Sequence, residues 1–441
     1  MTTPFLSPTV KWMPERRRLS QAGSLYLAVF ITVIIGFVTS VITTRILGPE
    51  RYGDMKFIVN VFQFLAIIST LGIFTTGSQM IARLDDGDKT KQKVVGALVI
   101  TALLISGMFV LISIVFSILE PRIFGNNLGV YFIVLSPLVA VSVFEPCIEG
   151  IFQGANRIHQ LSLFRILPGI LYLGSIVVIN FLYPLTLTIV LWIQLFTGVL
   201  VTAIILYILH PEISDFRYFQ KMIWWENRHY GWHVYIGVLS GVATTYLSTF
   251  MISYYLDNTN VGFFSLAVTL TMPLVQLSSV VGTTYFKDFA HSDILPTKVT
   301  VVTVVVAMIA LLVFLLFIGP LVTLVYTNKF NQVISLASII AFGSVLHGLG
   351  DYFNRFLGAH KRGKDLRNGA ITVGVVNILG YYFLVKFFGA HGAAITRLLS
   401  GMVYCGMMVY FYRVYRQERS SMVQLPPTVE VEPVSPDIPY T

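Results

Sequence analysis

Two glutamates offer the most unusual chemistry in the sequence. Glu145 and Glu149 are four residues apart within an apolar segment, so their carboxylates share one face of a helix. Carboxylates that approach each other in a low-dielectric medium repel, and holding a proton or a cation relieves the repulsion. We interpret the pair as a candidate proton or sodium site that couples an ion gradient to other work. The alternative is a structural ion pair with Arg157 or Arg165.

Three arginines are candidates for binding an anion. Arg45 and Arg397 fall about one turn inside one end of their apolar segments, and Arg165 lies about a turn inside the opposite end. A charge in hydrocarbon costs roughly 2.5–3.5 kcal/mol on insertion scales, so these residues are functional candidates. A guanidinium can hold a phosphate with two donors. Two alternatives stay open: Arg45 and Arg397 can extend to the interface, and Arg165 can be an ordinary cytoplasmic cation.

The segments that carry these residues are long and apolar. Apolar residues make up 55% of the 441-residue chain and charged residues 12%, whereas a soluble domain carries about 25% charged residues. Apolar runs of about 20 residues cross a bilayer as helices. We predict an all-α membrane protein with about twelve transmembrane helices. The predicted spans are residues 20–47, 54–83, 94–118, 128–151, 160–181, 187–209, 232–256, 262–286, 297–320, 333–357, 369–387 and 392–413.

Lys and Arg are distributed unevenly between the connecting loops. With these spans, 23 of the 30 lie on the side of the N-terminus and 7 on the other. Because cytoplasmic loops are enriched in Lys and Arg, both termini are predicted to be cytoplasmic, in a multi-pass protein of the plasma or inner membrane. The net charge of +9 follows from this distribution and needs no nucleic-acid partner. Membrane lipids are the expected neighbours.

The chain contains an internal repeat. The segments LGPERYG (47–53) and LDNTNVG (256–262) share the spacing of Leu and Gly, and FQGA (152–155) corresponds to FLGA (356–359). The repeat predicts two six-helix bundles related by a pseudo-two-fold axis along the membrane normal. The predicted divisions are a basic cytoplasmic N-terminus (1–19), an N-terminal bundle (20–209), a cytoplasmic interfacial linker (210–231), a C-terminal bundle (232–413) and a disordered cytoplasmic tail (414–441).

Three motifs resemble those of a known family. TRILGPERYG (44–53) is similar to the first loop of Wzx-type polysaccharide flippases of the multidrug/oligosaccharidyl-lipid/polysaccharide exporter superfamily. QGANR (153–157) is similar to that family's inner loop after its fourth helix, and GAHGAA (389–394) is similar to its turn into the twelfth helix. The resemblance implies two six-helix bundles around a central cavity. Related lipid flippases often place arginines deep in their first helices, but residues 19–44 are uncharged here. Those arginine sites are therefore not carried over.

The same resemblance implies a function. It implies that the chain moves a lipid-linked oligosaccharide or polysaccharide repeat unit, carried on a polyprenyl phosphate or pyrophosphate, from the cytoplasmic to the outer leaflet by alternating access for cell-surface glycan biosynthesis. Glycan assembly proteins are further expected partners. Two other functions stay open: a multidrug or cation antiporter of the same superfamily, and a non-transport membrane scaffold.

The sequence carries no pattern typical of catalysis or cofactor binding. We find no nucleophile–base set and no metal-ligand cluster. The segment GAHKRGK (358–364) has the spacing of a phosphate-binding loop, but Asp365 stands where the magnesium-binding Ser or Thr should be. We therefore expect no enzyme activity, no cofactor and no metal.

Overall fold

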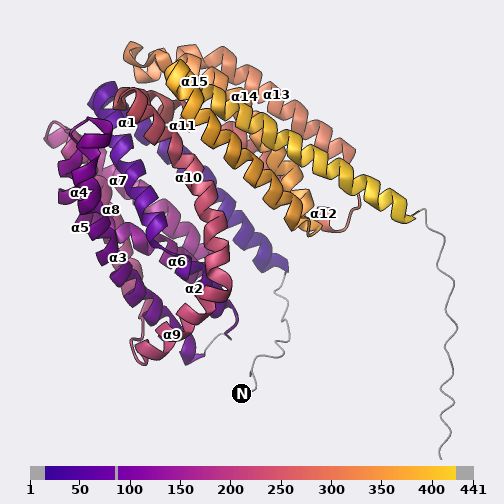
Figure 1. The fold of residues 1–441 in the computed structure, drawn as a ribbon, viewed down its shortest axis with the longest axis horizontal. Helices are drawn as coiled ribbons and strands as arrows, with labels where there is room; N and C mark the ends of the chain where they lie inside the picture. The colour runs from indigo at the N-terminus through magenta and orange to yellow at the C-terminus, as the bar shows by residue number, and fades with distance from the viewer. Residues whose placement is uncertain (1–14, 85–87, 424–441) are drawn as a thin grey trace, which may run out of the picture.

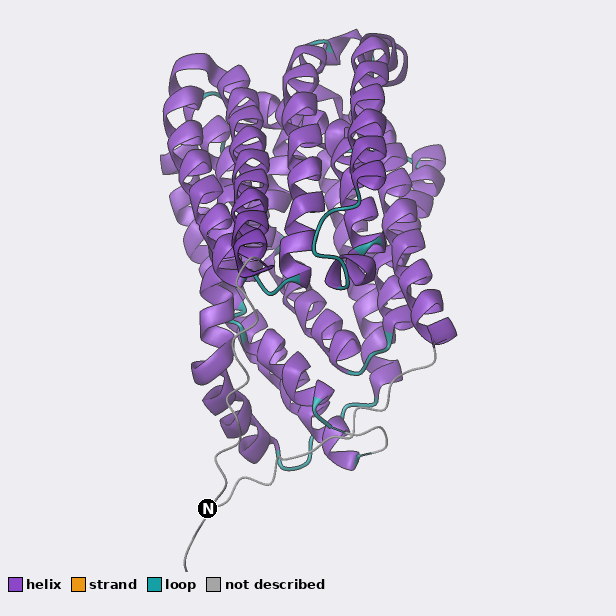
Figure 2. Ribbon diagram, turned by 90° about the vertical axis from the view of Figure 1, so that its right-hand side faces the viewer, coloured by secondary structure: helices purple, strands orange, loops and turns teal. Residues whose placement is uncertain are grey.

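The computed structural model describes residues 15–84 and 88–423. Within these ranges the backbone is helical and contains no strand (Figure 2). Most of the predicted basic N-terminus, and the predicted tail beyond Val423, lie outside the described residues. The last helix continues to Val423, whereas the sequence predicted that the tail begins at residue 414.

The helices follow one another with short connections. The first part of the chain forms α1 (Glu15–Ser69), α2 (Ile73–Ala82), α3 (Lys89–Phe124), α4 (Gly129–Val134), α5 (Ser136–Val139), the 3₁₀ turn η1 (Ala140–Val143), α6 (Phe144–Gly154), α7 (Ile158–Leu182) and α8 (Leu187–Leu209). The remainder forms α9 (Phe216–Glu226), the π-helical η2 (Asn227–Gly231), α10 (Trp232–Tyr255), α11 (Asn258–Thr284), α12 (Phe286–Ala290), α13 (Thr297–Leu321), the π-helical η3 (Val322–Tyr326), the 3₁₀ turn η4 (Asn328–Phe330), α14 (Gln332–Ala359) and α15 (Gly363–Val423).

Two glycines bend the longest helices where the sequence predicted breaks. Gly48 divides α1 with φ 70°, and Gly389 divides α15 with φ 59°. Glycine adopts such backbone angles without steric cost, whereas other residues rarely do. Helix α15 therefore holds two predicted spans, 369–387 and 392–413, whereas the predicted span 54–83 is divided between the end of α1 and α2 by a turn at Leu71 and Gly72. The two bends fall inside the TRILGPERYG and GAHGAA motifs, which confirms both motifs as turns.

The fold is that of a multi-pass membrane protein. Eight helices of the described residues are long and apolar enough to cross a bilayer, and α1 and α15, the two bent ones, are among them. Many apolar side chains on these helices point outward, such as Leu111, Phe181 and Leu316, which are 65%, 84% and 65% exposed. A soluble protein would not expose so much apolar surface. The remaining predicted spans, 128–151 and 232–256, correspond to the interrupted segment α4–α6 and to α10, so the structure is compatible with twelve spans.

The two parts of the chain meet at one end of the molecule. In Figure 1 the indigo and magenta helices of the first half and the orange and yellow helices of the second half converge near the labels α1, α11 and α15, and they diverge toward α9 and α12. We call the converging end the outer end, after the orientation predicted from the loop charges, and the opposite end the linker end. Helix α10 stands between the halves (Figure 1).

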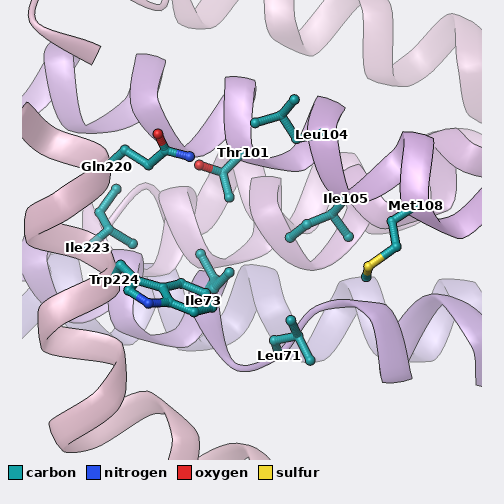
Figure 3. Close-up of a pocket in the computed structure, with 9 residues that line it drawn as sticks. All are labelled: Leu71, Ile73, Thr101, Leu104, Ile105, Met108, Gln220, Ile223 and Trp224. Carbon is teal, nitrogen blue, oxygen red and sulfur yellow. The ribbon is translucent and has the colours of Figure 1, made fainter. Parts of the chain in front are cut away.

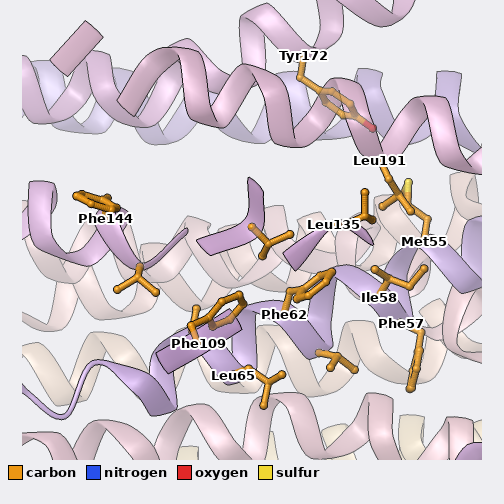
Figure 4. Close-up of a cluster of buried hydrophobic side chains, with 14 of the residues drawn as sticks. Met55, Phe57, Ile58, Phe62, Leu65, Phe109, Leu135, Phe144, Tyr172 and Leu191 are labelled. Carbon is orange, nitrogen blue, oxygen red and sulfur yellow. The ribbon is translucent and has the colours of Figure 1, made fainter. Parts of the chain in front are cut away.

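Aromatic side chains fill much of the core of the first half. Phe57, Phe62 and Phe109 lie in a buried cluster (Figure 4). The ring of Phe62 lies 5.0 Å from the ring of Phe132, so α1 packs against α4. This core fixes the part of α1 that follows Gly48, on which several polar side chains face the second half.

Candidate functional site

The outer end is closed by a contact between two glycines of the internal repeat. A Cβ atom on Gly53 would lie 1.8 Å from the carbonyl oxygen of Asn258, and one on Gly262 would lie 3.0 Å from the Cα of Gly53. Small residues allow helices to approach this closely in a membrane. The same approach lets the Nδ2 of Asn258 donate to the Oδ1 of Asp54 at 2.9 Å. Asp54 and Asn258 are both buried, so the halves are joined here by close packing and a buried hydrogen bond.

Arg45 takes part in this closure. Its Nε and Nη2 donate to the carbonyl oxygens of Val325 and Leu324, each at 2.7 Å. Nearby, the hydroxyls of Ser40 and Tyr326 are hydrogen-bonded at 2.8 Å. The π-helical η3 holds these acceptors and belongs to the second half. The guanidinium of Arg45 therefore links the two halves in this conformation. The sequence analysis predicted either a phosphate ligand or a side chain that extends to the interface, and it did not predict this contact.

Helix α10, the first helix of the second half, forms polar contacts with α1 of the first half and interacts with α15 of its own half. Toward α1, the hydroxyl of Tyr246 donates to the Oε1 of Gln63 at 3.2 Å, and the Nδ2 of Asn60 donates to the Oγ1 of Thr249 at 2.9 Å. On its other side, Ser248 of α10 interacts electrostatically with Tyr381 on α15. Hydrogen bonds of this kind are worth about 0.6 kcal/mol each in membrane proteins.

The acidic pair is divided between two environments. The Oε1 of Glu149 on α6 accepts from the Nε of Arg165 on α7 at 2.7 Å, and the two side chains are 27% and 35% exposed. Glu145 is exposed and forms no ion pair with any described residue. It still lies in the electrostatic field of Glu149 and Arg165, and its own charge reaches Tyr246 on α10. Of the two predicted partners, the structure selects Arg165 rather than Arg157 for Glu149.

Close backbone packing positions Arg397 on α15. A Cβ on Gly343 would lie 2.7 Å from the carbonyl oxygen of Arg397, and one on Gly401 would lie 2.2 Å from that of Gly343. This contact holds the second segment of α15 against α14. The guanidinium of Arg397 is partly exposed and interacts electrostatically with the hydroxyl of Tyr381. Among the described residues Arg397 forms no ion pair, so its guanidinium is a candidate for binding an anion.

The structure adds a polar group that the sequence analysis did not single out. The hydroxyl of Tyr404 donates to the Oδ1 of Asp351 at 2.8 Å, and the ring of Tyr404 stacks on His347 with centroids 4.5 Å apart. His347 and Asp351 are four residues apart on α14, and the charge of Arg397 reaches His347. The spacing that identified Glu145 and Glu149 could have identified this pair, because His347 and Asp351 both fall inside the predicted span 333–357.

The five predicted site residues do not form one cluster. Glu145, Glu149 and Arg165 come together on α6 and α7 of the first half, Arg397 lies on α15 of the second, and Arg45 lies at the contact between the halves. Among the described residues, no group of three or more His, Cys, Asp and Glu is arranged to hold a metal ion. The first half therefore carries both acidic and cationic candidates, and the second half carries the cationic candidate Arg397.

Comparisons with solved structures identify the fold. A multidrug resistance transporter of the MATE family of the MOP superfamily, in an inward-facing conformation, has 18% identity and a TM-score of 0.66, with 88% of this chain and 96% of that chain covered. The lipid II flippase MurJ, in an inward closed conformation, has 16% identity and a TM-score of 0.70, with 90% of each chain covered. A MOP superfamily transporter from Pyrococcus furiosus has 14% identity and a TM-score of 0.56, with 91% and 96% covered.

These likenesses show that the chain shares the fold of these solved structures, and the sequence establishes the family. No curated protein matches the chain. The sequence profile of the family described as "Polysaccharide biosynthesis protein" matches residues 19–286, which is more than half of the chain and includes the TRILGPERYG and QGANR motifs. The chain therefore belongs to the polysaccharide biosynthesis protein family.

Proposed function

We propose that this protein is a flippase that moves a lipid-linked oligosaccharide or polysaccharide repeat unit from the cytoplasmic to the outer leaflet by alternating access. Family membership supports a role in glycan biosynthesis. The likeness of its fold to a flippase of lipid II supports a lipid-borne substrate. The substrate would be a saccharide on a polyprenyl phosphate or pyrophosphate. Membrane lipids and glycan assembly proteins are the partners that this role requires.

One observation supports the proposal most directly: each half carries a partly exposed arginine within its spanning helices. Arg165 lies on α7 of the first half and Arg397 on α15 of the second. Cations in such positions are unfavourable unless they are used or paired. Arg165 forms an ion pair with Glu149, whereas Arg397 forms no ion pair with any described residue and interacts with the neutral hydroxyl of Tyr381. Arg397 is therefore the better candidate for the phosphate, and Arg165 is a secondary one.

Alternating access supplies a path in this proposal. The halves are joined at the outer end through Gly53, Asn258 and Arg45. Substrate would enter from the linker end, and the contacts at the outer end would then break to release it. We propose that an ion gradient supplies the free energy and that Glu145 and Glu149 bind the coupling proton or sodium ion. Coupling needs an ion site whose affinity differs between the inward-open and outward-open states.

A transport assay with purified protein tests the function. Proteoliposomes would be loaded with a fluorescent polyprenyl-pyrophosphate-linked sugar, and its accessibility to an impermeant quencher would be followed with and without a pH or sodium gradient. Protein-dependent movement of this lipid supports the proposal. Gradient-driven efflux of ethidium without movement of the lipid would indicate the multidrug antiporter instead. Movement of neither would leave the scaffold role.

The proposal also fixes an orientation: both termini in the cytoplasm of a plasma or inner membrane. Reporter fusions after Asp88, Asn227, Lys364 and Arg416 should report the cytoplasm, and fusions after Asn126, Asn258 and Asn328 should report the outside. The physical reason is the excess of Lys and Arg in the first set of loops. A single reversed loop in this series would contradict both the orientation and the proposed division into two six-helix bundles.

A further inference from the structure

A groove on the first half has the shape and chemistry of a lipid site. It has a volume of about 230 Å³ and lies between α2, α3 and α9 (Figure 3). Three buried side chains form its floor, and three exposed ones form its rim: Ile73, Ile105 and Ile223 in the floor, and Leu104, Met108 and Trp224 at the rim. An apolar chain placed here would be shielded on one side and open to the bilayer on the other.

The groove has a polar end and an apolar end. The amide of Gln220 and the hydroxyl of Thr101 face each other at one end, and Met108 lies at the other (Figure 3). Thr101 lies eight residues beyond Lys93 on α3, about 12 Å along the axis, and Met108 lies about 10 Å further into the membrane. The polar end is therefore the one nearer the linker end of the molecule. This order matches a phospholipid, with its headgroup at the surface and its acyl chain directed inward.

The apolar end leads onto a surface that contacts the bilayer. Leu104, Leu111 and Ile118 recur at intervals of seven residues on α3 and are 57%, 65% and 59% exposed. Residues with this spacing lie on nearly the same side of a helix. An acyl chain leaving the groove would continue along this stripe, so the groove is a recess in the lipid-facing surface.

Helix α9 is attached to the first half through its acidic neighbours. Lys93 pairs with Asp215 at 2.8 Å, just before α9 begins, and Arg83 pairs with Glu226 at 3.5 Å at its last residue. Phe219 and Ile223 are buried beneath the helix. The acidic groups of this segment are thus engaged with the N-terminal half, which leaves the cations of α9 uncompensated.

Those cations lie on the outer face of α9, beside the polar end of the groove. Arg217 and Lys221 are exposed, and among the described residues no carboxylate forms an ion pair with either. They are one turn apart, and Gln220 and Trp224 neighbour them on the same side. The combination is two free cations, an amide donor, an indole at the rim and an apolar recess. Basic segments beside a membrane attract anionic headgroups.

We propose that this groove binds one anionic phospholipid from the leaflet at the linker end. One acyl chain lies against Ile105 and Met108, and the phosphate lies between Gln220 and the cations Arg217 and Lys221. The lipid holds α9 against α2 and α3, at the point where the chain passes from the first half to the second. The site is independent of the transported molecule.

Native mass spectrometry of the full chain in detergent tests the site. The probes are phosphatidylglycerol and phosphatidylcholine with identical acyl chains. The unmodified protein should bind the phosphatidylglycerol more tightly. The double variant R217Q/K221Q should weaken that binding at least fivefold, because each cation near an anionic surface contributes about a factor of five. The double variant K361Q/K364Q removes two exposed cations, one just before α15 and one in its first turn, and should leave the binding unchanged.

A second pair of variants tests the recess without altering charge. L104W places an indole at the rim of the groove and should weaken the binding of phosphatidylglycerol. L111W adds the same side chain seven residues further along the exposed stripe, outside the groove, and should have no effect. Equal binding of the two lipids, or equal loss in the paired variants, would overturn the proposal. So would displacement of phosphatidylglycerol by undecaprenyl phosphate, because the groove would then serve the polyprenyl chain.

Discussion

Gly53 and Gly262 occupy the same position in the two copies of the internal repeat, and they lie against each other in the folded protein. A Cβ on Gly262 would be 3.0 Å from both the Cα and the nitrogen of Gly53. Equivalent residues of two repeats can touch only close to the axis that relates them. The repeated Leu and Gly spacing, which the sequence shows as a weak pattern, thus marks the point where the two halves meet. Because the contact needs glycine on both sides, even the methyl group of an alanine at either position should disrupt it.

Replacing Gly53 with alanine should open the outer end. The added methyl group would lie 1.8 Å from the carbonyl oxygen of Asn258, so the halves must separate. In a cysteine-free background, Thr44→Cys provides a buried reporter on α1. Its labelling by an impermeant thiol reagent from outside should rise severalfold in the Gly53→Ala protein. Gly198→Ala is the matched control, because a Cβ at Gly198 meets nothing within 4 Å. Unchanged labelling in Gly53→Ala would show that this contact does not hold the outer end closed.

Labelling at Thr44→Cys also distinguishes two roles for Arg45: closing the outer end and binding the anionic substrate. Arg45→Ala removes two charge-assisted hydrogen bonds to Val325 and Leu324, each worth roughly 1.5–3 kcal/mol. We expect labelling at Thr44→Cys to increase at least tenfold, with only a partial return in Arg45→Lys, because an ammonium cannot reproduce the fork of the guanidinium. Loss of transport with unchanged labelling would instead support the prediction that Arg45 binds the anionic substrate.

The sequence predicted the membrane fold from local information. Apolar runs gave the spans, and Gly48 and Gly389 lie where backbone angles require a break, so those features depend only on neighbouring residues. The partners of the charged side chains depend on packing. Arg45 and Val325 are 280 residues apart, and no local pattern connects them. Asp351 has its partner Tyr404 on another helix. Glu149 and Arg165 are an intermediate case, because a short turn joins their helices and restricts the choice to two arginines.

The two glutamates should now behave differently from each other. Glu149 is paired with Arg165, whereas Glu145 forms no ion pair with the described residues. Glu145→Gln should therefore weaken the dependence of transport on a pH or sodium gradient and leave protein abundance normal. Glu149→Gln should lower abundance or thermal stability, because the charge of Arg165 loses its partner. Flux in proteoliposomes and melting temperature in detergent distinguish these outcomes.

A double-mutant cycle checks the structural half of that prediction. The variant E149Q/R165Q should recover much of the stability that either single change loses, with an interaction energy of roughly 0.5–3 kcal/mol. Purely additive losses would mean that the ion pair contributes nothing to stability. If Glu145→Gln transports with the gradient dependence of the unmodified protein, the carboxylate at 145 is not the coupling group, and Asp351 becomes the next candidate.

Arg397 provides the most direct test of substrate binding. Its backbone is held by the packing of Gly343 against Gly401, and its side chain forms no ion pair with any described residue, so replacement of the side chain should leave α14 and α15 in place. Arg397→Ala should abolish movement of the lipid-linked sugar at normal abundance, and Arg397→Lys should retain part of it, because a point charge still binds phosphate. Tyr381→Phe should lower the apparent affinity with a smaller effect on maximal rate, since it frees the guanidinium without removing it. Lys386→Ala, an exposed cation on the same helix, controls for loss of charge. Normal transport by Arg397→Ala would contradict substrate binding by this arginine and support the alternative, in which its side chain extends to the membrane interface and binds no ligand.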